Sequence, residues 1–164
     1  MYNTEKLVNL LIEKNWRISC AESCTGGMLA ANIVDVPNAS KVFDASFVTY
    51  AEWTKNKFVG VSEEAIEKYT VVSNEVALQM AKGAAKETGA HVSVGITGIA
   101  GPSGGTDENP VGTVCFGFFV NSVEYCVKKY FGNIGRSAVR ALSVDFAVNT
   151  LIEIIEKESL NENS

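Results

Sequence analysis

A short stretch, residues 21–27 (AESCTGG), brings a hydroxyl, a thiol and two glycines together. An apolar run precedes it and a helix-like segment follows it, so we expect a strand to end and a helix to begin here. Glycine lets a ligand approach the backbone closely, and a helix N-terminus offers unpaired N–H groups that suit an anion or a developing oxyanion. Ser23 is therefore a candidate nucleophile, provided that a base lies nearby.

Two further loops follow predicted strands. One comes after residues 47–50 (FVTY) and contains Lys55, and the other is the glycine-rich segment 97–105. Ligands of open α/β sheets bind outside the carboxyl ends of parallel strands, so the three loops share one rim if their strands are parallel. Each also has a plain structural explanation: Ser23 and Thr25 could cap a helix, and Lys55 could be a solvated charge. Together they predict a site for a small, anionic molecule.

The base of such a site has to be something other than histidine. The one histidine, His91, falls within a predicted strand, so a Ser-His-Asp triad is not expected. A GxSxG elbow is also absent, because Ala21 and Thr25 occupy its glycine positions. A lysine whose pKa is depressed by burial could serve. Cys24 is a rival nucleophile, activated by the helix N-terminus, but adjacent residues at a strand end point in opposite directions, so only one of Ser23 and Cys24 faces the site.

Composition places the chain among soluble, single-domain proteins. It has 164 residues, 46% of them hydrophobic and 20% charged, with a net charge of −5. The charge argues against nucleic acid as a partner, and no apolar run is long enough for a membrane span or resembles a signal peptide. We therefore expect a cytoplasmic protein with free thiols and neither a metal nor a cofactor. The cysteines are Cys20, Cys24, Cys115 and Cys126, of which the last two are predicted to be small core residues.

The hydrophobic pattern predicts one three-layer α/β/α domain over residues 1–164, with a mixed, mostly parallel sheet and a late antiparallel hairpin. The last helix is apolar on more than one face, which predicts either a dimer interface or a central packing helix in the monomer. We expect residues 159–164 to be frayed. Helices are predicted at 4–14, 27–34, 52–58, 62–69, 73–88 and 137–158, and strands at 17–22, 42–50, 91–97, 112–120 and 123–131, the last two joined at Asn121-Ser122.

Four blocks of this sequence, in order, resemble the signature blocks of the CinA C-terminal domain family: residues 21–27, 47–50, 97–105 and 110–114 (PVGTV). The resemblance extends from about residue 7 to 155. Members of that family hydrolyse nicotinamide mononucleotide to nicotinic acid mononucleotide and ammonia, and they are compact α/β domains that are often dimeric. The resemblance implies a serine–lysine dyad here, formed by Ser23 and Lys55. It also implies the stand-alone form, without the molybdopterin-binding-like domain of fused members.

The phosphate of such a substrate needs a local basic group. Arg136 and Arg140 lie one helical turn apart near the start of the last helix, behind Gly132 and Gly135, and the family has arginines at both positions. Both could instead be solvated or paired with acids, and Gly104 to Thr106 is an alternative cradle. The residues expected to bind substrate are Thr25, Gly26, Gly27, Tyr50, Gly98, Ile99, Ala100, Gly101, Gly105, Arg136 and Arg140.

The chain departs from the family pattern at several positions. Glu52 stands where the family usually has asparagine, Asn109 replaces a common lysine, and Thr70-Val71 replaces glycine-alanine. A carboxylate at Glu52 could raise the pKa of Lys55 and weaken it as a neutral base. These departures support an alternative function, a nucleotide-binding sensor domain without hydrolytic activity.

Overall fold

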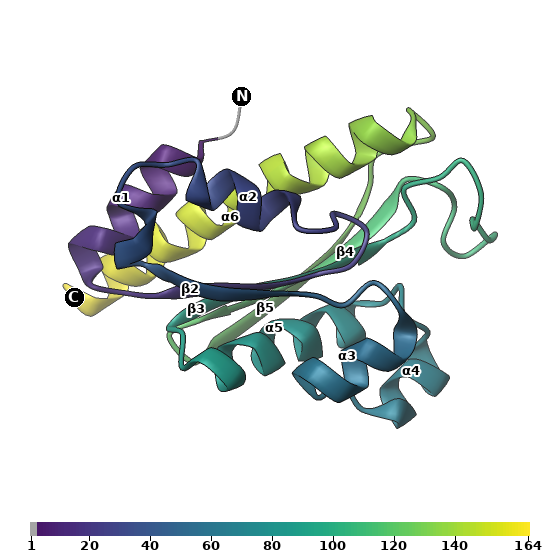
Figure 1. The fold of residues 1–164 in the computed structure, drawn as a ribbon, viewed down its shortest axis with the longest axis horizontal. Helices are drawn as coiled ribbons and strands as arrows, with labels where there is room; N and C mark the ends of the chain where they lie inside the picture. The colour runs from purple at the N-terminus through teal and green to yellow at the C-terminus, as the bar shows by residue number, and fades with distance from the viewer. Residues whose placement is uncertain (1–2) are drawn as a thin grey trace.

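The computed structural model describes residues 3–164, which form a five-stranded sheet between two layers of helices (Figure 1). The order of the strands across the sheet is β2-β1-β3-β4-β5. The strands are β1 (Ile18–Glu22), β2 (Phe43–Val48), β3 (Val92–Gly98), β4 (Thr113–Val120) and β5 (Val123–Tyr130).

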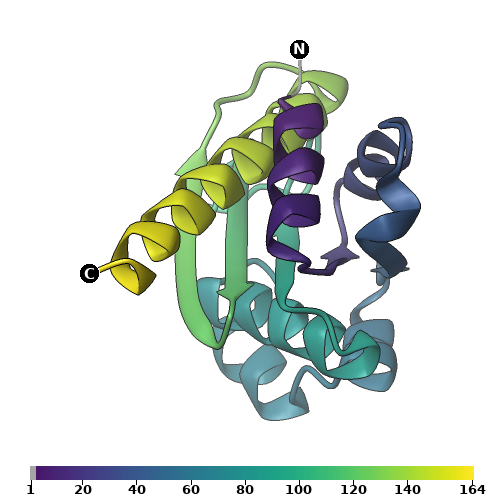
Figure 2. The same ribbon diagram turned by 90° about the vertical axis from the view of Figure 1, so that its left-hand side faces the viewer.

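The helices divide between the two faces of the sheet. One face carries α1 (Thr4–Lys14), α2 (Met28–Val34) and α6 (Arg136–Glu162), with α1 and α6 side by side in Figure 2. The other face carries α3 (Glu52–Val59), α4 (Glu63–Tyr69) and α5 (Asn74–Thr88). A single 3-10 turn, η1 (Ala39–Lys41), was not predicted from the sequence. Among the described residues no helix is both long enough and apolar enough to cross a lipid bilayer.

The strand directions bring the predicted loops together. β1 pairs in parallel with both β2 and β3, with Glu22 opposite Val48 on one side and Ile96 on the other. β4 is antiparallel to β3 and to β5, so within the described sheet only β4 runs against the others. The mixed sheet, the late hairpin and the shared rim are thus confirmed. The hairpin turns at Asn121 and Ser122, whose φ angles of 48° and 72° fit a tight two-residue turn.

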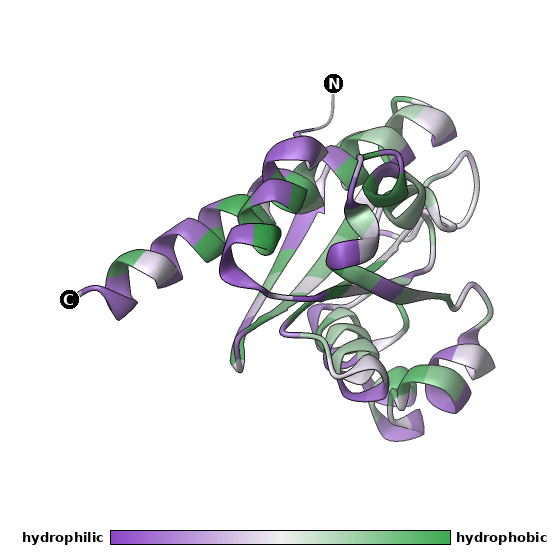
Figure 3. Cartoon of the chain, turned by 60° about the vertical axis from the view of Figure 1, so that its left-hand side comes forward, coloured by the Kyte–Doolittle hydropathy of each residue, from purple (hydrophilic) through white to green (hydrophobic). Residues whose placement is uncertain are grey.

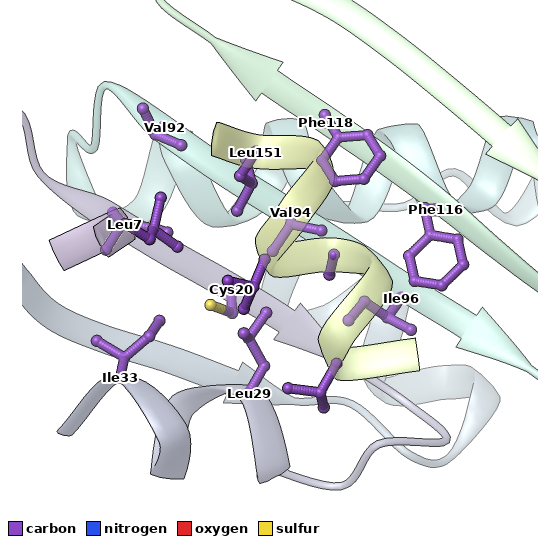
Figure 4. Packing of buried hydrophobic residues seen from close by; sticks show 14 of the residues in the cluster. Leu7, Cys20, Leu29, Ile33, Val92, Val94, Ile96, Phe116, Phe118 and Leu151 are labelled. Atoms are coloured by element: carbon purple, nitrogen blue, oxygen red, sulfur yellow. The ribbon is translucent and has the colours of Figure 1, made fainter. Parts of the chain in front are cut away.

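The main core lies between the sheet and the layer that contains α6. Leu7 of α1, Leu29 of α2 and Leu151 of α6 all point onto the central strands and have no exposed surface (Figure 4). The Phe116 ring of β4 lies 4.7 Å from that of Phe146 on α6. Burial on this scale is the main stabilising contribution to such a domain, and it holds α6 across the sheet, so that the N-terminal end of α6 lies beside the site.

Helix α5 packs unusually closely on the other face, and small residues make this possible. A Cβ atom added to Gly95 of β3 would lie 2.1 Å from the Ala77 carbonyl oxygen, and one added to Gly117 of β4 would lie 2.4 Å from that same oxygen. The side of α5 that faces the sheet is apolar, as the hydropathy colouring of Figure 3 shows. The predicted range of this helix, 73–88, is confirmed, and its ends are capped: the Ser73 hydroxyl accepts from Val76 N, and Gly89 takes the left-handed conformation.

Two sequence expectations about the far edge of the molecule need correction. Helix α6 continues to Glu162 instead of ending near residue 158. Leu160 and Glu162 favour the helical conformation, and the Tyr125 hydroxyl donates to Glu158 at 2.6 Å, which ties this end of α6 to β5. Cys126 is exposed and does not belong to the core. It lies on β5, an edge strand with little cover, whereas Cys115 on the central strand β4 is buried as predicted.

Candidate active site

Ser23 and Lys55, which are 32 residues apart in the chain, meet at the carboxyl end of the parallel strands. The Lys55 Nζ atom lies 3.0 Å from the Ser23 Oγ atom. It also donates to the carbonyl oxygen of Thr49 at 2.6 Å and, at 3.4 Å, to that of Tyr50. Only 1% of Lys55 is exposed, because it lies on the side of α3 that also buries Val59, and this helix packs against α5. The lysine is a buried, fully engaged group and not a solvated surface charge.

Burial makes this lysine a weaker base than usual. The pKa of Lys55 is lowered from 10.5 to about 8, chiefly because desolvation penalises the ammonium form. Electrostatic interaction with the neighbouring Cys24 and Glu52 acts in the opposite direction and raises the pKa. The sequence correctly identified the effect of Glu52, but burial outweighs it. A substantial fraction of Lys55 is therefore neutral at mildly alkaline pH.

A buried carboxylate, Glu22, holds the loop that presents Ser23. Its Oε1 atom accepts from Leu29 N at 2.9 Å and its Oε2 atom from Ala30 N at 3.1 Å. Glu22 thus satisfies two of the N–H groups in the first turn of α2 that would otherwise lack partners. Sequence reasoning missed this role. The available signal was a carboxylate at the end of a buried strand, a few residues before a helix without a capping side chain.

Arg140 holds the same loop from the opposite side. Its Nε atom donates to the Cys24 carbonyl oxygen and its Nη2 atom to that of Thr25, each at 3.0 Å. Gly26 and Gly27 have φ angles of 57° and 97°, a left-handed conformation that glycine adopts without strain. The loop is therefore fixed by a carboxylate, a guanidinium and two glycines.

The structure corrects the idea that Cys24 is an activated thiol. Burial raises the pKa of Cys24 to about 12, and the Glu22 carboxylate adds to the increase. Helix α2 begins only at Met28, and Glu22 already occupies amides of its first turn, so the helix N-terminus does not lower the pKa of this thiol. Ser23, not Cys24, contacts Lys55.

A cavity of about 790 Å³ opens beside Ser23 and Lys55. At its rim Arg136 donates to the Gly101 carbonyl oxygen and to the Tyr50 hydroxyl, both at 2.9 Å, so it links the glycine-rich loop to the loop after β2. Both Ser23 and Cys24 border this cavity, contrary to the expectation that only one of them would face the site. The other residues proposed from the sequence that line it are Tyr50, Lys55, Gly98, Ile99, Ala100, Gly101, Gly104, Thr106 and Arg136.

The other proposed residues lie outside the lining of this cavity. Thr25 is buried, Gly26 and Gly27 shape the loop, and Arg140 engages the loop carbonyls. Gly105 packs against Val111, whose N atom would lie 2.8 Å from an added Cβ. Polar lining residues that the sequence did not single out as ligands include Thr97, Ser103, Asp107 and Glu108. In the described part of the chain, no three His, Cys, Asp or Glu side chains are grouped as metal ligands would be.

Comparison with known proteins agrees with this architecture. The model of the family described as "CinA C-terminal domain" matches residues 2–155, so the chain belongs to that family. It is 43% identical over 139 residues to a protein of Enterobacter agglomerans named nicotinamide-nucleotide amidohydrolase PncC, covering 85% of each chain. It also resembles a crystal structure of a CinA superfamily protein from Escherichia coli, with a TM-score of 0.89 and 38% identity over 92% of this chain and 87% of that one.

Other relatives are considerably longer than this chain. A putative competence-damage inducible protein of Clostridium botulinum, strain Langeland, is 40% identical over 148 residues. That match covers 90% of this chain but only 36% of the relative. The chain therefore spans little more than a third of such relatives.

Proposed function

We propose that this protein hydrolyses the carboxamide of nicotinamide mononucleotide, with Ser23 as nucleophile and Lys55 as general base. The observation that carries the proposal is the 3.0 Å contact between Lys55 Nζ and Ser23 Oγ inside a cavity. The name of the Enterobacter agglomerans relative supports the choice of reaction and substrate. The products would be nicotinic acid mononucleotide and ammonia, in the salvage of pyridine nucleotides.

The hydrogen bonds around Lys55 suit a base. The carbonyl oxygens of Thr49 and Tyr50 can only accept, so they take two N–H groups of the lysine. A neutral amine has two N–H groups and one lone pair. With both N–H groups engaged, the lone pair is left for the proton of the Ser23 hydroxyl. The two carbonyl groups therefore orient the amine for proton transfer.

The reaction follows from this arrangement in two halves. Ser23 Oγ bonds to the carboxamide carbon while its proton passes to Lys55; the C–N bond then breaks, and Lys55 returns the proton to the leaving nitrogen, which departs as ammonia. Water, deprotonated by Lys55, next attacks the acyl ester. The bond between the acyl carbon and Ser23 Oγ then breaks, Lys55 returns the proton to that oxygen, and the acid product loses its proton to solvent and leaves as the carboxylate.

One backbone N–H is assigned to the oxyanion that forms in both halves. In the glycine-rich loop, the backbone N–H of Ile99 is already used, because it donates to the Thr113 carbonyl oxygen at 2.9 Å. Ala100 lines the cavity, and its N–H has no hydrogen-bond partner within residues 3–164. Such a donor is typically worth about 3 kcal/mol of transition-state stabilisation.

Arg136 is the proposed phosphate ligand. It lies on the cavity wall, whereas Arg140 is committed to the Ser23 loop. A guanidinium has five N–H donors, so contacts to Tyr50 and Gly101 leave others for a phosphate oxygen. The nucleotide would then extend from the dyad, where the carboxamide reacts, to the start of α6.

We also propose that the protein is a homodimer. Tyr130, Ile134 and Leu142 are large apolar residues on or near α6 with 63%, 49% and 41% of their surface exposed, and a second copy could cover them. Light scattering at micromolar concentration tests this, and a monomeric mass would contradict it.

The decisive experiment measures ammonia released from nicotinamide mononucleotide, nicotinamide riboside and nicotinamide by the wild type and by Ser23→Ala. We expect release from the nucleotide at pH 8 and loss of it in the variant. If the nucleotide binds by calorimetry but no ammonia above the variant's level appears between pH 7 and 9, the protein is a nucleotide-binding domain without this activity.

A further inference from the structure

Glu52 places an uncompensated negative charge at the dyad end of the cavity. It lies in the first turn of α3, three residues before Lys55, a spacing that puts both side chains on one side of the helix. Both line the cavity that Ser23 also lines. Across residues 3–164 the Glu52 carboxylate has neither an ion-pair nor a hydrogen-bond partner. Lys55 interacts with this charge electrostatically but forms no ion pair with it, because the Lys55 amine makes its hydrogen bonds to Ser23 and to two carbonyl oxygens.

The substrate and product of the proposed reaction differ in charge at the atom group nearest this carboxylate. Both contain a cationic pyridinium ring and an anionic phosphate. The substrate has a neutral carboxamide, whereas the product has a carboxylate bonded to the same carbon. Arg136, at the phosphate end, meets the same group in both molecules. A charge near the dyad is therefore what can distinguish them.

Without another charge nearby, Lys55 would bind the carboxylate product more tightly than the carboxamide substrate. At neutral pH much of it is protonated, and an ammonium beside the new carboxylate would retain the product by ion pairing. A second carboxylate nearby opposes this attraction, while it attracts the pyridinium that both molecules carry. Asp107 and Glu108 line the same cavity and add to its negative potential.

We propose that Glu52 is a specificity-determining residue that weakens binding of the carboxylate product relative to the carboxamide substrate. This inference rests on the proposed function for the identity of the two molecules. It assigns Glu52 no bond-making step. The side chain acts through its charge, which leaves the Ser23–Lys55 contact intact.

Binding without turnover tests the proposal. In the Ser23→Ala background, calorimetry gives the dissociation constants of nicotinamide mononucleotide and nicotinic acid mononucleotide. Glu52→Gln should lower the ratio of the acid constant to the amide constant by about two- to fivefold, the range for one exposed charge pair. The decrease should shrink in 0.5 M salt, which screens exposed charges but would not change a merely structural role.

Glu67→Gln is the matched control. It makes the same change of charge at an exposed position on α4 that does not line the cavity, and it should leave the ratio unchanged. An unchanged ratio in Glu52→Gln, an equal decrease in both variants, or failure of both nucleotides to bind would overturn the proposal. If the ratio shifts as expected but the wild type releases no ammonia, the proposed hydrolysis fails while the role of Glu52 stands.

Discussion

Within residues 3–164 two hollows of nearly equal volume lie at opposite ends of the sheet. The site cavity, at the carboxyl ends of β1, β2 and β3, has about 790 Å³, and the other has about 810 Å³. The second hollow is bordered by His91, which precedes β3, by the β4–β5 turn and by Lys82 and Lys86 on α5. Its lysines lie on the solvent side of the molecule, and Lys82 is paired with Glu124 at 2.6 Å.

The two hollows differ in the chemistry of their lysines and not in size, and this difference is why we propose the site at the Lys55 cavity. Lys55 contacts a hydroxyl, and desolvation by burial lowers its pKa to about 8. Lys82 has about half of its side chain in water, and water and counterions screen such a charge. Parallel strands also direct three loops to one end of the sheet, whereas the other hollow is bordered by a tight hairpin turn and by the end of α5.

The largest expected effect contrasts a lysine from each hollow. Lys55→Met should lower kcat for ammonia release by about 10²–10⁴-fold, because general-base catalysis is lost. Lys86→Met, at the opposite hollow, should leave kcat unchanged. Steady-state kinetics measure both, and melting curves check that both variants fold. Comparable losses in the two variants would break the distinction between the hollows.

The next contrast concerns the ligand. Arg136→Ala should weaken the binding of nicotinamide mononucleotide by roughly 1.5–3 kcal/mol, which raises the dissociation constant about 10–150-fold, since a charge-assisted contact with phosphate is lost. Binding of nicotinamide riboside, which lacks the phosphate, should change little. Calorimetry in the Ser23→Ala background separates the two ligands. An equal loss for both would mean that Arg136 only braces Tyr50 and Gly101.

The pH profile tests which group controls activity. In the proposed mechanism the reactive form of Lys55 is the neutral amine, which predominates above its pKa of about 8. Activity should therefore rise about tenfold per pH unit between pH 6 and 7.5 and level off above pH 8 to 9. His91→Asn, in the other hollow, should not move the midpoint. A profile that is flat from pH 6 to 9 in the wild type contradicts a lysine base.

The smallest effect is expected at Cys24. Because burial raises its pKa to about 12, this thiol is protonated at working pH and Cys24→Ala should keep most of the wild-type activity. Ammonia release measured beside Ser23→Ala makes the comparison direct. Abolished activity in Cys24→Ala, in a variant that melts normally, would favour the thiol over the hydroxyl as nucleophile.

Most of the fold could be predicted from sequence because local signals agreed with it. Ser62, Ser73 and Gly89 marked helix ends that the structure confirms, and Asn121-Ser122 marked the hairpin. Errors arose where the signal was not local. The end of α6 depends on packing against β5, and the exposure of Cys126 depends on its strand being at an edge.

The two arginines of α6 show the same limit at the site. Their spacing correctly placed them on one side of the helix, and both reach the rim. Their spacing could not predict that Arg136 lines the cavity, whereas Arg140, one helical turn later, binds the carbonyl groups of the Ser23 loop. That difference depends on where α6 crosses the sheet, which the buried core between α1, α2 and β4 decides.

The sequence by itself determined the succession of strands and helices along the chain and the residue types at each strand end, because hydrophobic periodicity, caps and glycines act over a few residues. It also supplied Ser23 and Lys55 as candidates. Only the tertiary structure decided that these two meet, that Lys55 is desolvated enough to lower its pKa, and that Glu22 and Arg140 hold the loop. Lys55 and Ser23 are 32 residues apart in the chain, and Arg140 and Thr25 are 115 apart, so these contacts and the burial of Lys55 from water arise only when the chain packs. No local sequence pattern encodes them.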